Sequence, residues 1–93
     1  MPSYIYSKWH NSPADSPVEF YSELNNDRFE TRKVEVFKDG SLGFSSEKAS
    51  SKTTRLGIVA VPPLAEIAKQ PEFDIHIITP QQFEEKWKEA HGK

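Results

Sequence analysis

Histidines, serines and carboxylates are the side chains in this 93-residue sequence that could carry out acid–base, nucleophilic or metal chemistry. His10, His76 and His91 stand at no spacing typical of a metal site, and none lies beside paired carboxylates. His10 precedes a loop, where a general base could act, but a surface or capping histidine is the more common role there. No serine is flanked by glycines, and no glycine-rich phosphate loop occurs. The sequence therefore predicts no catalytic motif, no metal site and no cofactor.

Acidic residues are concentrated in one stretch of the chain. Between residues 11 and 31, five carboxylates stand against one arginine, a local net charge of −4. These carboxylates belong to Asp15, Glu19, Glu23, Asp27 and Glu30. An acidic surface of this kind attracts a basic protein partner and raises its association rate. The alternative is an ordinary solvated strand face, with Glu19 paired to Lys33 across a hairpin.

A basic stretch follows later in the chain. Lys48, Lys52 and Arg55 occur without an intervening acid, in and next to the Ser- and Thr-rich segment 45–54. A segment without a large apolar residue is typical of a surface loop. Contact with a phosphate group is the alternative role.

The composition excludes several classes of protein. The absence of cysteine excludes a disulfide scaffold, a cysteine nucleophile and thiolate metal sites. A net charge of −2 does not favour a nucleic-acid binder. There is neither a basic leader segment nor an apolar run of about 18 residues, so we expect a cytoplasmic protein without a membrane span. Six Phe, two Trp and three Tyr favour a folded chain, a single domain over residues 1–93.

Most of the elements that must position these side chains are expected to be strands. Alternation of apolar and polar residues predicts strands over residues 4–9, 18–24, 28–37, 42–45 and 73–78. In the second of these, Val18, Phe20 and Leu24 should face one way, with Glu19 and Tyr21 facing the other. Residues 56–61 end at two prolines and form either an edge strand or an extended packed segment.

Two turns set the expected strand pairing. A three-residue loop over residues 25–27 would place Val18 opposite Val34 and Glu19 opposite Lys33, which pairs opposite charges. The Asp39-Gly40 dipeptide predicts a type I′ turn with positive φ at both residues. That turn would pair residue 37 with 42 and residue 35 with 44, leaving apolar groups on both faces. Either both faces are partly covered, or a bulge resets the alternation.

The C-terminal segment has the clearest helix pattern. Thr79 is a good N-cap, Pro80 suits the first helical position, and Gln82 completes a capping box. Phe83 and Trp87, together with Ala90, form an apolar stripe. A shorter helix of one or two turns is expected after residue 63, and it must stop before Pro71. The predicted fold is α+β, an antiparallel meander of four or five strands with the C-terminal helix packed on one face.

Several short runs resemble a family of small bacterial domains of unknown function. The similarity is carried above all by the run Arg32-Lys33-Val34-Glu35-Val36-Phe37 with the following Asp39-Gly40, and it extends from Lys8-Trp9-His10 to Trp87. It covers nearly the whole chain and implies no established activity. More loosely, a stand-alone domain of this size and composition is similar to the immunity proteins that accompany bacterial toxins.

These observations favour a non-enzymatic binding protein. We expect an immunity protein that occludes the active site of a cognate toxin, a basic nuclease, through the five acidic residues between Asp15 and Glu30. The alternative is a small enzyme or ligand-binding domain that uses His10 with Glu and Arg residues of the central strands.

Overall fold

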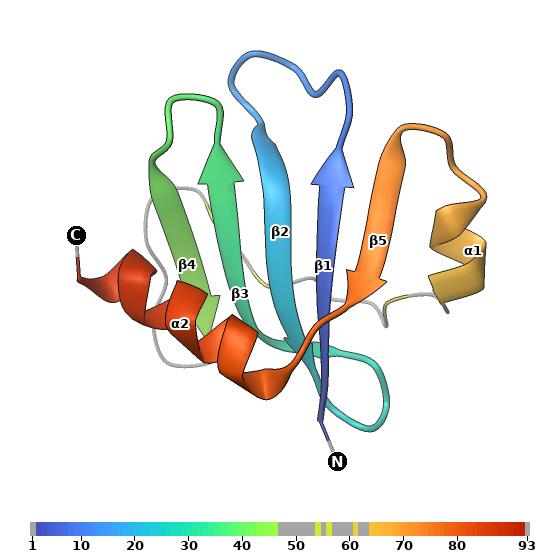
Figure 1. The fold of residues 1–93 in the computed structure, drawn as a ribbon, viewed down its shortest axis with the longest axis vertical. Coiled ribbons are helices and arrows are strands. Elements are labelled where there is room, and N and C mark those ends of the chain that lie inside the picture. Colours follow the sequence, from blue (N-terminus) through green and yellow to red (C-terminus); the bar gives the residue numbers. More distant parts are fainter. Residues whose placement is uncertain (1, 47–53, 55, 57–60, 62–63, 93) are drawn as a thin grey trace.

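The computed structural model describes residues 2–46, 54, 56, 61 and 64–92. Five strands and two helices occur in this part of the chain (Figure 1). They are β1 (Ser3–Trp9), β2 (Pro17–Leu24), β3 (Glu30–Phe37), β4 (Leu42–Ser46), α1 (Leu64–Ala68), β5 (Phe73–Ile77) and α2 (Pro80–His91). The expected basic loop around Lys48, Lys52 and Arg55 and most of the expected segment 56–61 lie outside the described residues.

The strands form one antiparallel sheet in the order β4-β3-β2-β1-β5. The first four strands form a meander, and β5 joins the sheet beside β1. Helix α2 crosses one face of the sheet, and α1 lies beside β5 (Figure 1). The expected α+β architecture, with an antiparallel sheet and a C-terminal helix on one face, is confirmed.

The side chains on the face that α2 covers, called here the α2 face, form three parallel rows. The strand pairing gives these rows as Ile78-Tyr4-Glu23-Arg32-Ser46, His76-Tyr6-Tyr21-Val34-Phe44 and Asp74-Lys8-Glu19-Val36-Leu42. Helix α2 packs on the first row through Tyr4 and Phe83, whose ring centroids are 5.4 Å apart. It packs on the β4 end of the second row through Phe44 and Trp87, 5.7 Å apart. The β5, β1 and β2 residues of the second and third rows are left open.

The opposite face of the sheet also carries buried side chains. Ile5, Leu24 and Phe20 point to this side, and Leu24 is fully buried. Thr54 is also fully buried, and its Oγ1 donates a hydrogen bond to Glu35 at 2.8 Å. The predicted alternation of β2 is therefore confirmed for Phe20 and Leu24, which face away from Tyr21 and Glu19, whereas Val18 lies at an irregularity of the pairing between Pro17 and Glu19.

The turn between β2 and β3 differs from the expected one. Five residues, Asn25 to Phe29, separate the strands, and Asn25 Oδ1 accepts backbone hydrogen bonds from Asp27 and Phe29, each at 3.0 Å. Arg28 completes the turn with a left-handed φ of 67°. The longer loop shifts the register by three, so Glu19 lies opposite Val36, and Lys33 lies opposite Ser22. The expected pairs of Val18 with Val34 and Glu19 with Lys33 are therefore wrong.

The turn between β3 and β4 also differs from the expected one. Its bulge accounts for the apolar groups that the expected pairing left on both faces of the sheet. Gly40 has a φ of 87° and donates its N–H to the carbonyl of Phe37, whereas Asp39 does not take a positive φ. The turn is thus a three-residue loop ending in a left-handed glycine, which introduces a bulge, and not a type I′ turn. The register moves by one, so Val36 pairs with Leu42 in place of the expected pairing of Phe37 with Leu42.

Helix α2 begins as the sequence predicts. Thr79 Oγ1 accepts a hydrogen bond from the N–H of Gln82, and the Gln82 side chain accepts one from the N–H of Thr79. Phe83 is fully buried and Ala90 nearly so, which confirms the apolar stripe. The shorter helix, α1, ends before Pro71 as expected.

Candidate functional site

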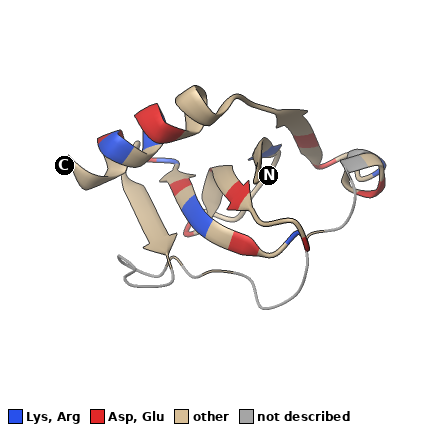
Figure 2. Cartoon of the chain, turned by 90° about the horizontal axis from the view of Figure 1, so that it is seen from below, with Lys and Arg blue, Asp and Glu red and all other residues tan. Residues whose placement is uncertain are grey.

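The five acidic residues expected at a binding site are dispersed over the structure. Asp15 and Asp27 are exposed in the loops at opposite ends of β2. Glu19 and Glu23 lie on the α2 face, whereas Glu30 points to the opposite face with Lys33. Figure 2 shows Asp and Glu positions spread over the strands and both helices. The structure therefore does not bring these five residues together on one surface.

Glu23 belongs to a hydrogen-bond network that links the sheet to α2 through Arg32. Its carboxylate accepts hydrogen bonds from Arg32 at 2.8 and 2.7 Å, from Tyr4 at 2.9 Å and from Thr31 at 2.7 Å. Arg32 also donates to Glu84 of α2 at 2.6 Å, and its guanidinium lies over the Phe83 ring. The hydrogen bonds from Arg32 lower the pKa of Glu23 to about 2, against the opposing effect of burial. This carboxylate therefore has a structural role.

Glu30 belongs to a second polar group on the opposite face. Its carboxylate is 3.0 Å from Lys33 Nζ, and these two side chains are only 11% and 13% exposed. They line a cleft of about 330 Å³ together with apolar residues such as Phe20, Ile67 and Ile75. A shielded ion pair of this kind contributes to the interior of the domain, so Glu30 is not part of an open acidic surface.

Among the five acidic residues expected at a binding site, Glu19 lies next to an open site. Its Oε2 accepts a hydrogen bond from the Tyr6 hydroxyl at 2.5 Å. Burial raises the pKa of Tyr6, and the hydrogen bond to Glu19 raises it further, so Tyr6 stays a neutral phenol. Tyr6 lies between His76 and Tyr21 in the second row of the α2 face, in the part that α2 leaves open.

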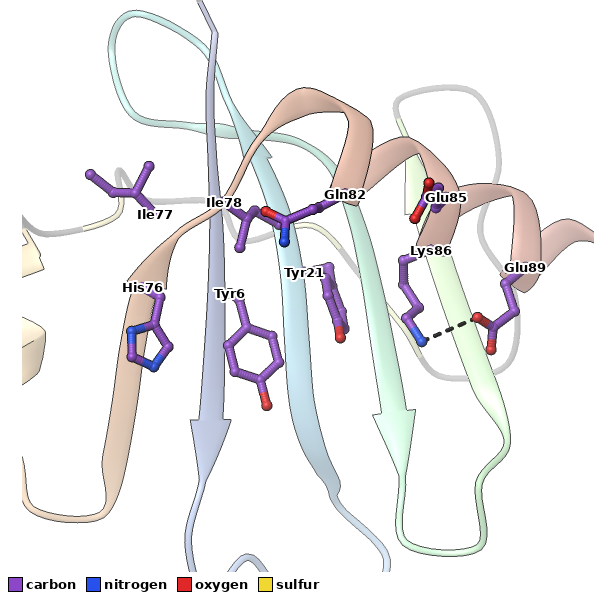
Figure 3. A pocket seen from close by; sticks show the side chains of 9 residues that line it. All are labelled: Tyr6, Tyr21, His76, Ile77, Ile78, Gln82, Glu85, Lys86 and Glu89. Atoms are coloured by element: carbon purple, nitrogen blue, oxygen red, sulfur yellow. Dashed lines mark hydrogen bonds and ion pairs between the residues drawn. The ribbon is translucent and has the colours of Figure 1, made fainter.

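A hollow of about 560 Å³ occupies this open part and is called here the aromatic hollow. Its lining residues are Tyr6, Tyr21, His76, Ile77, Ile78, Gln82, Glu85, Lys86 and Glu89 (Figure 3). The rings of His76 and Tyr6 are nearly parallel, at 12°, with centroids 6.1 Å apart. Tyr21 meets Tyr6 edge to face, with centroids 5.0 Å apart. Three neighbouring strands therefore place three rings side by side on the open sheet.

Helix α2 supplies the charged wall of the aromatic hollow. Lys86 Nζ lies 5.2 Å from the centroid of the Tyr21 ring and 3.2 Å from a carboxylate oxygen of Glu89. Glu85 is exposed, and it has no ion-pair partner among the residues that the structure describes. The capping box at Thr79 fixes the helix start and so positions these side chains. The wall combines a paired lysine with one open carboxylate.

The third row extends this surface with more charge. Asp74, Lys8 and Glu19 lie side by side on β5, β1 and β2, next to the ring row. With Glu85, Glu89 and Lys86, the region holds four carboxylates and two ammonium groups. This excess of carboxylates favours a positively charged partner.

His10 lies at the far end of the same face. Its Nε2 is 2.8 Å from Asp74 Oδ2, and both side chains are exposed. The Glu23 and Arg32 pair lies in the first row, beneath α2, whereas His10 follows the third row. The structure therefore pairs His10 with Asp74 and does not place it with the Glu and Arg residues of the central strands.

The described residues contain no group of three or more His, Asp or Glu side chains that could hold a metal ion. In the same part of the chain, no helix has the length and apolar character needed to cross a membrane.

The aromatic hollow was not predicted from the sequence. The alternation of residues in the sequence puts Tyr4 and Tyr6 on one side of their strand, and His76 on the side of its strand opposite the apolar residues. However, only the pairing of β5 with β1 brings His76 beside Tyr6, across 70 positions of the chain. The position of β5 at the β1 edge carries no local sequence signal.

Residues 3–92 match a protein family described as a domain of unknown function (DUF6881). The chain belongs to this family. The match confirms the expected relation to a domain of unknown function over nearly the whole chain. No curated protein and no solved structure matches the chain.

Proposed function

We propose that this DUF6881 domain is a non-enzymatic binding protein that neutralises a basic protein partner. In the form suggested by the sequence, it is a cytoplasmic immunity protein that occludes the active site of a nuclease-like bacterial toxin. The observation that supports this proposal best is the aromatic hollow, with Tyr6, Tyr21 and His76 on an open sheet face beside an excess of carboxylates.

The chemistry of the hollow suits a protein partner. Tyrosine is enriched at the energetic centres of protein interfaces, because its ring buries a large area and its hydroxyl keeps a hydrogen bond. The Tyr6 hydroxyl already has such a bond to Glu19. Carboxylates around an open surface accelerate the approach of a basic protein. A basic nuclease active site, which binds phosphates, has the complementary charge.

The acidic residues proposed to bind the partner therefore differ from the five expected from the sequence. Glu19 remains, and Glu85 and Glu89 of α2 join it. Glu23 and Glu30 are assigned to the interior by their hydrogen bonds and ion pairs. Asp15 and Asp27 remain as exposed loop carboxylates outside the hollow.

A second candidate function is supported by His10. Its 2.8 Å contact with Asp74 is the arrangement in which a carboxylate orients an imidazole for acid–base chemistry or ligand binding. A small enzyme or ligand-binding domain would use this pair. His10→Ala would then abolish activity or ligand binding, whereas it would leave neutralisation of a protein partner unchanged if the first proposal holds.

Co-expression with the proteins encoded by the adjacent genes tests the first proposal. We expect one of these proteins to arrest growth alone and to lose that effect in the presence of this domain. Glu85→Lys should abolish the relief of growth arrest, because it reverses the charge at the rim of the hollow. The matched control is Glu66→Lys, the same change at an exposed position of α1. Relief that is absent, or equal for both variants, would contradict the proposal.

A further inference from the structure

The cleft of about 330 Å³ that holds Glu30 and Lys33 lies on the face of the sheet opposite the aromatic hollow. Both charged residues line it, and it is called here the Glu30–Lys33 cleft. Ile67 of α1 and Gln70, in the turn that follows, line it from beside the sheet. Pockets that bind small molecules have volumes of about 300–1,000 Å³, so this cleft suits a small ligand.

Two serines explain why the sheet is hollowed at this place. Strand pairing puts Ser7 between Phe20 and Ile75. Ser22 lies beside Ile5 in the neighbouring row and is buried. The serine side chains are shorter than these apolar neighbours, so a space with apolar walls remains above them. An apolar group of matching size would fill this space with favourable contacts.

The polar part of the cleft carries two opposite charges. Lys33 Nζ lies 3.0 Å from Glu30 Oε1. Ser22 Oγ donates a hydrogen bond to Glu30 Oε2 at 3.5 Å, which places the carboxylate next to the serine floor. A shielded ion pair adds little net stability, because taking both charges out of water costs about as much free energy as their attraction returns. Its position beside apolar walls therefore favours a role in recognition.

We propose that the Glu30–Lys33 cleft binds a small apolar α-amino acid as its zwitterion. The ligand carboxylate pairs with Lys33, the ligand ammonium pairs with Glu30, and the ligand side chain packs between Phe20 and Ile75. The site is on the other face of the sheet from the aromatic hollow, so this binding activity goes beyond the proposed function and does not depend on it.

A zwitterion fits this cleft better than a molecule with a single charge does. Glu30 and Lys33 together carry no net charge, so a lone anion or cation meets an attraction and a repulsion at nearly the same distance. In an α-amino acid the ammonium and the carboxylate are attached to one carbon atom, so both can be paired at once. An ammonium has three donors and a carboxylate has several acceptor positions, so each side chain can hold more than one partner.

Titration of the full chain with L-leucine tests the proposal. Backbone amide shifts of the ¹⁵N-labelled protein are followed by NMR at constant ionic strength. We expect saturable shifts centred on Ser7, Ser22 and Lys33, with a dissociation constant on the order of 100 µM. The amides of Glu85 and Lys86, on α2 at the opposite face, should not shift.

Three related ligands separate the parts of the recognised group. N-acetyl-L-leucine lacks the ammonium, L-leucinamide lacks the carboxylate, and glycine keeps both charges but lacks the apolar side chain. Each should bind at least about tenfold more weakly than leucine, because each loses one of the three contacts. Equal binding of leucine and either blocked derivative would overturn the inference, since the cleft would then recognise only the apolar group.

A variant of the serine floor tests the place of binding. Ser7→Val fills the cleft without changing the ion pair, and a β-branched residue suits a strand, so the fold should persist. A spectrum with the dispersion of the wild type verifies folding. We expect leucine binding to weaken at least about tenfold, whereas Ser3→Val, the same change at the exposed start of β1, should leave it within about twofold of wild type.

A double variant tests the contribution of the charges. Glu30→Gln combined with Lys33→Gln removes both charges of the pair together, which avoids the larger cost of removing only one. Leucine should bind this variant at least about tenfold more weakly than wild type, and no more tightly than leucinamide does.

Two further results would overturn the inference: no saturation below about 20 mM leucine, or leucine shifts that are the same in Ser7→Val and wild type. Neutralisation of a protein partner is measured separately, so a failure of leucine binding leaves the proposed function unaffected.

Discussion

At the scale of single residues, carboxylates from the same acidic stretch have different environments. Glu23 accepts hydrogen bonds from Arg32, Tyr4 and Thr31, and Glu30 pairs with Lys33 in a shielded position. Glu19 instead borders an open hollow through Tyr6. These differences follow from the face of the sheet and from the cross-strand neighbours, so the residue type alone does not define the role.

Glu23→Gln should destabilise the domain in a pH-dependent way. The folded-state pKa of Glu23 is about 2, below its ordinary value of 4.5, so its ionisation stabilises the folded state. That contribution is complete above about pH 4.5 and is lost as the pH falls toward 2. We expect the variant to lower the free energy of unfolding by about 1–3 kcal/mol at pH 7. Urea denaturation at several pH values measures this difference.

The difference between wild type and Glu23→Gln should shrink as the pH is lowered from 4.5. Glu66→Gln, at an exposed position of α1, serves as the control and should have little effect at any pH. A wild-type to Glu23→Gln difference that is independent of pH would show that the charge of Glu23 does not contribute through Arg32.

Gly43→Ala should destabilise the domain because of one close approach. A methyl group at this position would collide with Oγ1 of the fully buried Thr54. We expect a loss of about 1–3 kcal/mol in the free energy of unfolding. In the Thr54→Ala background the loss should be smaller, since the colliding atom is gone. Purely additive effects in this double-mutant cycle would contradict the contact.

At the scale of elements, the sequence predicted which segments are strands and helices but not how the hairpins pair. The alternation of β2 and the capping box of α2 are local signals, and both are confirmed. The register between β2 and β3 depends on the loop from Asn25 to Phe29, where Arg28 takes a left-handed conformation. Arginine carries no signal for that conformation, so the sequence favours a shorter loop and a charge pair that the structure does not contain.

Gly40→Val should harm the β3–β4 turn more than Ser41→Val does. Gly40 has a φ of 87°, which strains a β-branched residue even though the space around the position is open. We expect a cost of about 1–2 kcal/mol for Gly40→Val and a clearly smaller one for Ser41→Val. Thermal unfolding of the two variants compares them. Equal midpoints would show that the left-handed glycine is not required.

Truncation of the two α2 anchors, Phe83 and Trp87, should lower the stability of the domain by different amounts. Phe83 is fully buried against Tyr4 and Arg32, whereas Trp87 is only half-buried against Phe44. Phe83→Ala should cost about 3–5 kcal/mol, a large part of the stability of a small domain. Trp87→Ala should cost less, because its side chain loses less buried area. A chemical denaturation midpoint that hardly moves for Phe83→Ala would show that α2 is peripheral.

At the scale of the whole molecule, the site depends on how the topology combines distant segments. Helix α2 covers the first side-chain row and the β4 end of the second, so Tyr6, Tyr21 and His76 remain open beside it. The sequence predicts the sheet and the helix, but the edge that β5 joins is decided by tertiary packing. The candidate site could not be predicted for that reason.

The central claim is that the aromatic hollow is the surface that binds a basic protein partner. The most direct test is the dissociation constant of the neutralised partner, measured by isothermal titration calorimetry with wild type, Glu85→Lys and Glu66→Lys. We expect Glu85→Lys to weaken binding by at least about tenfold, or about 1.4 kcal/mol, because it reverses a charge at the rim of the hollow. Glu66→Lys should stay within about twofold of wild type, since α1 lies outside the hollow. Equal dissociation constants for wild type and Glu85→Lys would contradict the claim.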